Sequence, residues 1–239
     1  MFKQNLLIEN IPAIIWGKKS NKIIVAVHGN MSSKSDIPIE ILAEEAILEG
    51  YQVLSFDLPE HGDRKAAPEL CKVQNCVQEL GKIMEAAQKN SNEISLFACS
   101  IGAYFSLLAY KDVQLKQSLF LSPVVDMSRI IDNMMKWFHV SCEQLKSEQE
   151  VATPTGNKLY WDYYCYVQEN PIEQWNSPTN ILYGKDDNIC EIDVLSAFSK
   201  KFNCGMEIME HGEHYFHTPE QLDFFRQWLK KYLNKSNPK

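Results

Sequence analysis

The hydrophobic positions of the chain follow two patterns, short continuous runs and stripes with helical spacing. The continuous runs end at polar residues, which is typical of strands buried on both faces of a sheet. They lie at Lys22–His28, Tyr51–Phe56, Ile94–Cys99, Ser118–Leu121, Thr179–Tyr183 and Met206–Met209. Near the start, Leu6–Glu9 and Ala13–Trp16 flank Asn10-Ile11-Pro12, and this arrangement predicts a short antiparallel pair.

Segments with helical periodicity lie between these runs. The stripe over 73–87 advances in steps of four and three residues, through Val73, Val77, Leu80, Met84 and Ala87. Asp36 is placed to cap an earlier helix, which Gly50 ends. Further helices are expected over 101–110, 192–202 and 219–232. Strands that alternate with helices predict an α/β fold, a mostly parallel, doubly wound sheet of about eight strands with helices on both faces.

The alternation stops over 124–177. Two helical pieces, Met127–Phe138 and Ser141–Ser147, are followed by a Thr-Pro-Thr-Gly break and the aromatic run Leu159–Tyr164. No linker or repeat marks a second domain. We therefore expect a single domain over 1–239, with 124–177 inserted in it as a small cap.

Composition excludes several kinds of partner. The formal net charge is −7 and basic residues gather only in the tail, at Lys230, Lys231, Lys235 and Lys239, so we expect no nucleic-acid partner. No apolar run approaches the roughly 20 residues that a membrane span needs, and the N-terminus lacks the pattern of a signal peptide. The seven cysteines are an odd number without metal-ligand spacing, which favours free thiols in a reducing, cytoplasmic setting.

Ser100 stands where a strand meets a helix. The run Ile94–Cys99 ends directly before it, and a helical segment begins at Ile101. A serine on such a turn holds its hydroxyl out of the sheet, beside the free N–H groups of the helix start. The residues two before and two after it pass close together, which favours glycine; Gly102 fits this pattern and Ala98 departs from it. Taken alone, an ordinary serine cap explains the stretch equally well.

Other polar residues follow strands at the same edge, where doubly wound sheets place their chemistry. They are His28-Gly29-Asn30, Asp57, His61, Asp126, Asp186, Asp187, His211 and His214. A serine nucleophile needs a base for its proton and a carboxylate that orients the base. Ser100, Asp187 and His214 supply these three groups in the order Ser, Asp, His, and Asp186 and Asp126 remain alternative acids.

Three histidines raise a metal site as another possibility. His211, His214 and His217 recur at every third position, but zinc sites of this kind usually add a carboxylate or cysteine at a fixed spacing, and the chain has no H-E-x-x-H segment. We therefore expect no metal and no other cofactor. His61, in a turn against Gly62, is expected to be structural.

Five motifs in order make the sequence resemble the α/β-hydrolases over nearly its whole length. They are Val27-His28-Gly29-Asn30, Phe56-Asp57-Leu58-Pro59-Glu60-His61-Gly62, Ala98-Cys99-Ser100-Ile101-Gly102, Leu182-Tyr183-Gly184-Lys185-Asp186-Asp187 and Gly212-Glu213-His214-Tyr215-Phe216. The resemblance is to the serine esterases and dienelactone-hydrolase-like members. It implies Ser100 as nucleophile, His214 as base, Asp187 as acid, and the backbone N–H groups of Asn30 and Ile101 as oxyanion donors.

The resemblance implies a hydrolase that cleaves carboxylic esters with a small to medium acyl group. The methionine and aromatic side chains of the cap then either line an apolar pocket over Ser100 or pack the cap onto the domain; they are Met134, Met135, Trp137, Phe138, Tyr160, Trp161, Tyr163 and Tyr164. Three alternatives stay open, namely a peptidase or acyl-peptide hydrolase, a thioesterase, and a non-catalytic ligand-binding protein. The expected partner is a small ester, and a homodimer is compatible with the sequence.

Overall fold

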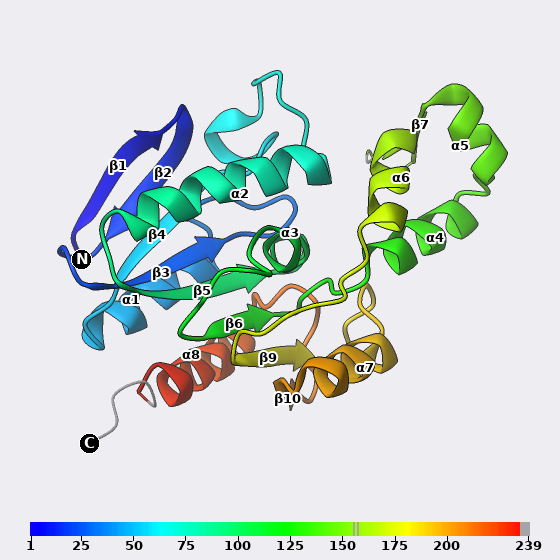
Figure 1. The fold of residues 1–239 in the computed structure, drawn as a ribbon. Coiled ribbons are helices and arrows are strands. Elements are labelled where there is room, and N and C mark those ends of the chain that lie inside the picture. The colour runs from blue at the N-terminus through cyan, green and yellow to red at the C-terminus, as the bar shows by residue number, and fades with distance from the viewer. Residues whose placement is uncertain (155, 157, 235–239) are drawn as a thin grey trace.

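The computed structural model describes residues 1–154, 156 and 158–234, and within them eight strands form one sheet (Figure 1). Their order across the sheet is β1-β2-β4-β3-β5-β6-β9-β10. The bounds are β1 (Lys3–Ile8), β2 (Ile11–Trp16), β3 (Lys22–Val27), β4 (Gln52–Phe56), β5 (Glu93–Cys99), β6 (Ser118–Leu121), β9 (Thr179–Gly184) and β10 (Gly205–Met209). β2 pairs antiparallel with β1 and β4, and every other neighbouring pair in this sheet is parallel. The predicted fold class is confirmed.

Helices cover both faces of the sheet (Figure 1). Their bounds are α1 (Ile37–Leu48), α2 (Val73–Gln88), α3 (Ile101–Ala109), α7 (Ile192–Phe202) and α8 (Pro219–Asn234), and a short 3₁₀ turn, η1 (Gly62–Arg64), follows β4. The Asp36 carboxylate caps α1 by accepting a hydrogen bond from the Ile37 N–H, as its place in the sequence predicts. One buried cluster joins the sheet to α2, α3 and α7, and a second joins it to α1 and α8.

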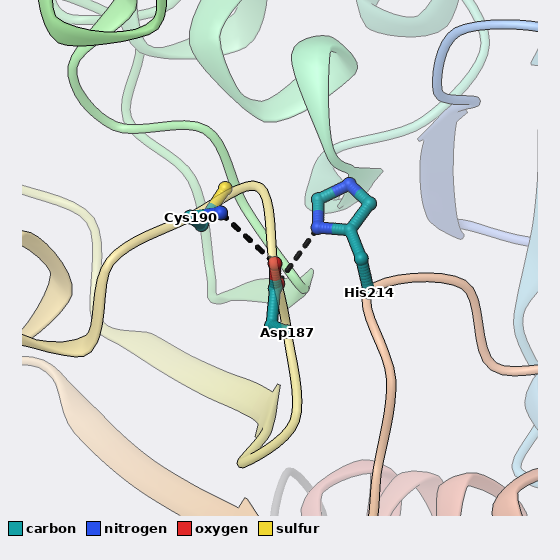
Figure 2. A group of neighbouring side chains, drawn as sticks. All are labelled: Asp187, Cys190 and His214. Carbon is teal, nitrogen blue, oxygen red and sulfur yellow. Dashed lines mark hydrogen bonds and ion pairs between the residues drawn. The ribbon is translucent and has the colours of Figure 1, made fainter. Parts of the chain in front are cut away.

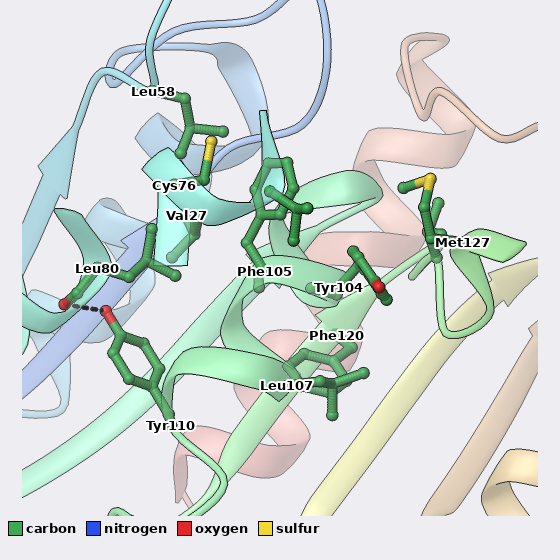
Figure 3. Packing of buried hydrophobic residues seen from close by; sticks show 14 of the residues in the cluster. Val27, Leu58, Cys76, Leu80, Tyr104, Phe105, Leu107, Tyr110, Phe120 and Met127 are labelled. Atoms are coloured by element: carbon green, nitrogen blue, oxygen red, sulfur yellow. Dashed lines mark hydrogen bonds between the residues drawn. The ribbon is translucent and has the colours of Figure 1, made fainter. Parts of the chain in front are cut away.

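The core around α3 is packed from aliphatic and aromatic side chains (Figure 3). Phe105 and Leu107 of this helix are no more than 1% exposed. The buried Tyr110 hydroxyl donates to the Leu80 carbonyl oxygen of α2 at 2.9 Å, so its polar group is satisfied inside the apolar cluster. These contacts hold α3 against β5 and so fix the junction that carries Ser100.

The segment between β6 and β9 holds separate elements beyond the ends of the central strands (Figure 1). They are α4 (Met127–Trp137), α5 (Cys142–Glu148), the antiparallel pair β7 (Glu150–Ala152) and β8 (Lys158–Tyr160), and α6 (Trp161–Glu169). The sequence pattern predicts neither the hairpin nor the helix over 161–169, because strands of three residues are too short to show alternation. The Lys72 ammonium of the loop before α2 lies 2.8 Å from the Asp162 carboxylate and ties this segment to the domain. The single domain and the 124–177 cap boundary stay predictions.

Among the described residues, every helix is too short or too polar to cross a bilayer. The lysines of the tail divide between two regions. Lys230 and Lys231 belong to α8, whereas Lys235 and Lys239 lie outside the described residues.

Candidate active site

Ser100 occupies the turn between β5 and α3 in a conformation that side chains seldom adopt. Its φ is 48° and its ψ is −122°, in a region where a residue with a Cβ is strained. Three backbone hydrogen bonds hold the turn: Ser100 N–H donates to the Leu121 carbonyl oxygen, and its own carbonyl oxygen accepts from Ala103 and Val124. The turn therefore has the geometry expected of a nucleophile, whose hydroxyl is held away from the strand.

Close backbone approach explains the glycine two residues after Ser100. A Cβ at Gly102 would lie 2.4 Å from the His28 carbonyl oxygen, which no packed structure tolerates. At the other position, Ala98 is fully buried in β5, in register with Val27 of β3 and Phe120 of β6. The methyl group of Ala98 is accommodated there while Ser100 keeps its positive φ, so this departure from glycine does not prevent the turn.

Replacing Gly102 with alanine is expected to lower the free energy of unfolding by about 1–3 kcal/mol, because the added methyl group must push two backbone segments apart. Gly81 of α2 is the matched control, since a Cβ there meets nothing within 4 Å. Gly81→Ala should raise stability by about 0.5–1 kcal/mol, because alanine loses less conformational entropy in a helix. Urea unfolding of both variants measures this. Equal changes in the free energy of unfolding for the two variants would contradict the explanation that close backbone approach requires glycine at position 102.

A chain of hydrogen bonds runs from Ser100 through His214 to Asp187. The Ser100 Oγ lies 2.8 Å from His214 Nε2, and His214 Nδ1 lies 2.7 Å from an Asp187 carboxylate oxygen. The other Asp187 oxygen accepts from the backbone N–H groups of Ile189 and Cys190, at 2.8 and 2.9 Å (Figure 2). Because the carboxylate side chain is fully buried and both oxygens are engaged, its orientation toward His214 is fixed.

The two other candidate acids make different contacts. Asp186 is exposed and its carboxylate lies 3.6 Å from His211 Nδ1. Asp126 caps α4 by accepting from the Arg129 N–H at 2.9 Å. Of the three aspartates left open by the sequence, the structure places Asp187 against His214.

The two predicted oxyanion donors flank Ser100. Ile101 is the first residue of α3, so its N–H has no acceptor within the helix and belongs to the positive end of the helix dipole. Asn30 follows Gly29, where an added Cβ would lie 3.1 Å from the Ser100 Cβ. The loop after β3 thus runs directly beside the turn.

His28 holds that loop and stays neutral. Its Nδ1 donates to the Gly29 carbonyl oxygen at 2.7 Å, and its Nε2 accepts from the Leu58 N–H at 3.0 Å. Burial lowers the pKa of His28 to about 4, although the bond to Gly29 acts in the opposite direction. A neutral ring that both donates and accepts ties the loop after β3 to the loop after β4.

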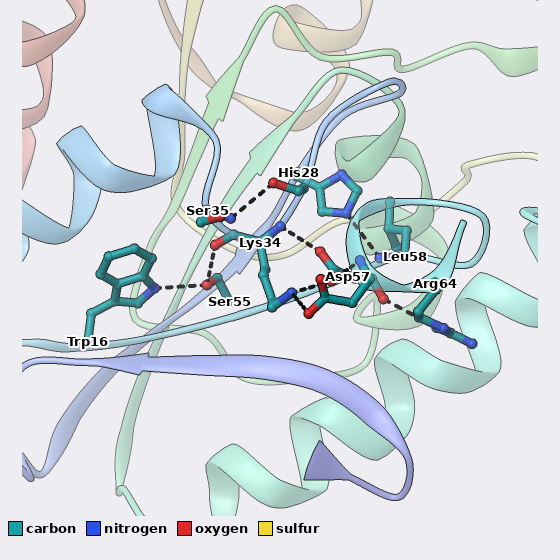
Figure 4. Close-up of polar contacts among 10 residues, drawn as sticks. Trp16, His28, Lys34, Ser35, Ser55, Asp57, Leu58 and Arg64 are labelled. Carbon is teal, nitrogen blue, oxygen red and sulfur yellow. Dashed lines mark hydrogen bonds and ion pairs between the residues drawn. The ribbon is translucent and has the colours of Figure 1, made fainter. Parts of the chain in front are cut away.

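A buried ion pair braces the same loops (Figure 4). The Asp57 carboxylate accepts from the Lys34 ammonium at 2.5 Å, from the Lys34 backbone N–H at 2.8 Å and from the Asp63 N–H at 2.9 Å. The Lys34 carbonyl oxygen in turn accepts from the Ser55 hydroxyl at 2.6 Å. Sequence reasoning missed Lys34; its only signal is an acidic residue, Asp57, that directly follows a buried strand.

Replacing Asp57 with asparagine is expected to lower the free energy of unfolding by about 3–5 kcal/mol, because it leaves the buried Lys34 charge without its main partner. Asp63→Asn is the matched control. Asp63 contacts the same ammonium at 2.7 Å but its side chain is 72% exposed, so its loss should cost no more than about 1 kcal/mol. Urea unfolding compares the two. Similar losses of unfolding free energy for both variants would show that burial does not determine how much each carboxylate contributes to the ion pair with Lys34.

The residues with metal-ligand chemistry near the site are already occupied with other partners. Donor atoms of Asp187, Cys190 and His214 lie within 4.8 Å of one another. Both carboxylate oxygens are used as described above, and burial, followed by the charge of Asp187, raises the pKa of the Cys190 thiol, so the sulfur stays protonated. His211 and His217 lie apart from this group and are largely exposed.

A cavity of about 780 Å³ lies between α3, α7 and the segment 124–177. Tyr104, one helical turn after Ser100, forms part of its wall. The apolar part of the lining is completed by Val125, Met127, Val167, Pro171, Ile172, Val194, Ala197, Phe198 and Phe202. The methionines and aromatic residues expected over Ser100 do not line this cavity; Met134, Phe138 and Tyr163 pack against the main core, and Trp137 is 61% exposed.

Solved structures share this architecture at low sequence identity. Est1E from Butyrivibrio proteoclasticus, in a structure with bound ferulic acid, matches with a TM-score of 0.78 and 18% identity over 98% of each chain. Alpha/beta hydrolase domain-containing protein 10 from mouse matches with a TM-score of 0.76 and 13% identity, over 99% of this chain and 100% of that one. An esterase from Pyrococcus furiosus matches with a TM-score of 0.71 and 16% identity, over 98% of this chain and 90% of that one.

Comparison by sequence adds nothing to this likeness. No protein-family model matches the chain, and no curated protein does. The structural likeness establishes the α/β-hydrolase fold, while the expected branch within it remains a prediction.

Proposed function

We propose that this protein of the α/β-hydrolase fold is a serine hydrolase that cleaves carboxylic esters through an acyl-enzyme intermediate. The observation that carries the proposal is the chain of hydrogen bonds from Ser100 through His214 to Asp187, set at a strained strand-to-helix turn. The likeness to an esterase from Pyrococcus furiosus and a monoacylglycerol lipase from Paleococcus ferrophilus supports it.

In this mechanism Ser100 Oγ attacks the acyl carbon of the ester. His214 Nε2, 2.8 Å away, takes the hydroxyl proton and then delivers it to the leaving alcohol. Asp187 keeps the proton of the imidazole on Nδ1 and stabilises the imidazolium that forms. Water, activated by the same histidine, then releases the acid and restores the Ser100 hydroxyl.

The developing oxyanion is held by the backbone N–H groups of Ile101 and Asn30. Loss of one such donor typically costs about 2.7–4 kcal/mol of transition-state stabilisation. Because these donors belong to the backbone, the side chains at both positions are free to serve other purposes. The Asn30 amide, for example, contacts His61.

The acyl group is proposed to extend from Ser100 past Tyr104 into the cavity beside α3, which Ser100 and His214 do not themselves line. Its lining is mixed: beside the apolar side chains it contains polar and charged ones, among them Asp126, Arg129 and Glu191. Such a site suits a small or medium acyl group, and the ferulic acid bound to Est1E has this chemistry.

A substrate panel tests the proposal. The purified protein should hydrolyse p-nitrophenyl esters of short and medium acyl length and should be labelled by a fluorophosphonate probe. Matched thioesters and aminopeptidase-type amides belong in the same panel. Faster turnover of amides or thioesters would leave Ser100 as the proposed nucleophile, but the proposed substrate would then be an amide or a thioester rather than an ester. Failure of both turnover and labelling would overturn the proposal, and ligand binding without turnover would then favour a binding protein.

A further inference from the structure

Two cysteines outside the proposed catalytic group lie within reach of each other. All seven cysteines are free, and the Sγ atoms of Cys71 and Cys76 are 3.7 Å apart. Cys76 is buried in the second turn of α2, whereas Cys71 is partly exposed in the irregular stretch 69–72 before that helix. The sulfurs must approach to about 2.05 Å to bond, which requires the irregular stretch to move toward the helix.

The surroundings of Cys71 favour its thiolate. Hydrogen bonds from the Cys76 thiol, and then from His61, lower the pKa of the Cys71 thiol despite its burial. Burial lowers the pKa of His61, but its hydrogen bonds with Cys71 and the Pro59 carbonyl oxygen outweigh this and raise it. Burial, and then the contact with Cys71, raise the pKa of Cys76. The pair thus divides into an attacking thiolate and a protonated partner.

The ring of His61 is held by contacts at both of its nitrogens. Its Nδ1 lies 2.7 Å from the Pro59 carbonyl oxygen and its Nε2 lies 3.0 Å from the Asn30 amide oxygen. Both ring nitrogens are therefore engaged, one within its own turn and one with the loop after β3. The sequence pattern predicts a structural role for His61, and its contacts with Asn30 and Cys71 add a link between the loop after β3 and the cysteine pair.

The residues beside the cysteine pair contact both the loop after β3 and helix α6. On one side, His61 connects Cys71 to Asn30 in the loop that follows β3. On the other side, Lys72 stands between the two cysteines in sequence and holds Asp162 of α6 at 2.8 Å. A bond between the sulfurs would therefore alter both the oxyanion loop and the attachment of the segment 124–177.

We propose that Cys71 and Cys76 form a thiol-modification site that reacts with small disulfides such as oxidised glutathione and closes into an intramolecular disulfide. The Cys71 thiolate attacks one sulfur of the glutathione disulfide, forms a mixed disulfide and expels glutathione thiolate. Cys76 then attacks the Cys71 sulfur, its proton passes to the second leaving glutathione, and the Cys71–Cys76 bond forms. Two protein thiols are oxidised while one glutathione disulfide is reduced to two glutathione molecules.

Closure removes the thiolate beside His61 and draws Cys71 toward the helix. The His61 ring thereby loses its contact with the Cys71 sulfur, and the contact of the same ring with the Asn30 side chain is altered. The expected effect, which rests on the proposed ester hydrolysis, is a severalfold lower kcat/KM in the oxidised protein that dithiothreitol restores.

Mass spectrometry tests the site directly on the full chain. After incubation with oxidised glutathione and alkylation of the remaining thiols, trypsin cleaves after Lys72 and separates the cysteines, so the disulfide joins peptide Ala66–Lys72 to peptide Val73–Lys82. Cys76→Ser should instead accumulate the glutathione adduct on Cys71. Cys142, an exposed cysteine on α5, is the control for access. At pH 7, iodoacetamide should modify Cys71 about tenfold faster than Cys142 although Cys71 is less exposed.

The outcomes separate this site from the proposed function. Joined peptides with a reversible loss of ester hydrolysis support the whole proposal, and Cys71→Ser should abolish both effects while Cys142→Ser abolishes neither. Joined peptides without change in activity would overturn the coupling to the oxyanion loop. Mixed disulfides at Cys142 without a Cys71–Cys76 crosslink would overturn the site. Absence of ester hydrolysis in the reduced protein would count against the proposed function alone, because the crosslink is measured independently.

Discussion

Replacing Ser100 with alanine is expected to lower kcat for p-nitrophenyl acetate by about 10⁵-fold or more and to abolish fluorophosphonate labelling. The reason is that the side chain supplies the attacking oxygen, and no other hydroxyl is placed on His214 Nε2 by the contacts of the described residues. The fold should persist, because Ser100 holds its turn through backbone groups that alanine retains.

Ser106→Ala is the matched control for this loss. Ser106 lies on the same helix, and its buried hydroxyl donates to the Gly102 carbonyl oxygen at 2.7 Å rather than to the histidine. We expect its kcat to stay within a few fold of the unaltered protein. Steady-state kinetics and probe labelling, with circular dichroism as a check on folding, compare the two variants. Retained labelling of a folded Ser100→Ala protein would exclude Ser100 as the nucleophile.

Replacing Asp187 with asparagine is expected to lower kcat by about 10⁴-fold with little change in KM. An asparagine amide at this buried place no longer enforces a proton on His214 Nδ1, so the Nε2 atom that faces Ser100 loses its role as acceptor. The charge that stabilises the imidazolium is removed as well. The expected split between kcat and KM distinguishes this effect from damage to substrate binding.

Asp186→Asn and Asp126→Asn are the controls, because sequence reasoning leaves both aspartates open as the acid. Asp186 faces the exposed His211 and Asp126 caps α4, so both variants should keep kcat within a few fold. Because Asp126 borders the cavity, its replacement can alter substrate binding, so the effect of this variant is judged by kcat rather than by KM. A 10⁴-fold loss in either control, with an active Asp187→Asn protein, would reassign the acid.

Much of the fold follows from local pattern. The runs Lys22–His28 and Ile94–Cys99 predict strands β3 and β5 to within a residue or so, because short continuous apolar runs rich in β-branched residues are typical of strands buried on both faces. The antiparallel pair at the start is confirmed, but the turn is Glu9-Asn10 rather than Asn10-Ile11-Pro12, because Ile11 and Pro12 pair with Ile8 and Leu7 as part of β2. The hairpin β7–β8 is missed, because its strands are too short for a pattern and are stabilised by their place in the segment 124–177.

Sequence alone determined the order of strands and helices, the turn at Ser100 and the small set of polar residues at the strand ends. These features depend on neighbours in the chain, since periodicity, capping and the need for glycine at 102 act over a few residues. Only the tertiary structure decided which aspartate meets His214, and that Cys71 meets both Cys76 and His61. Ser100 and His214 are 114 positions apart, and a contact of that kind depends on how strands are ordered and loops packed, which no local pattern records.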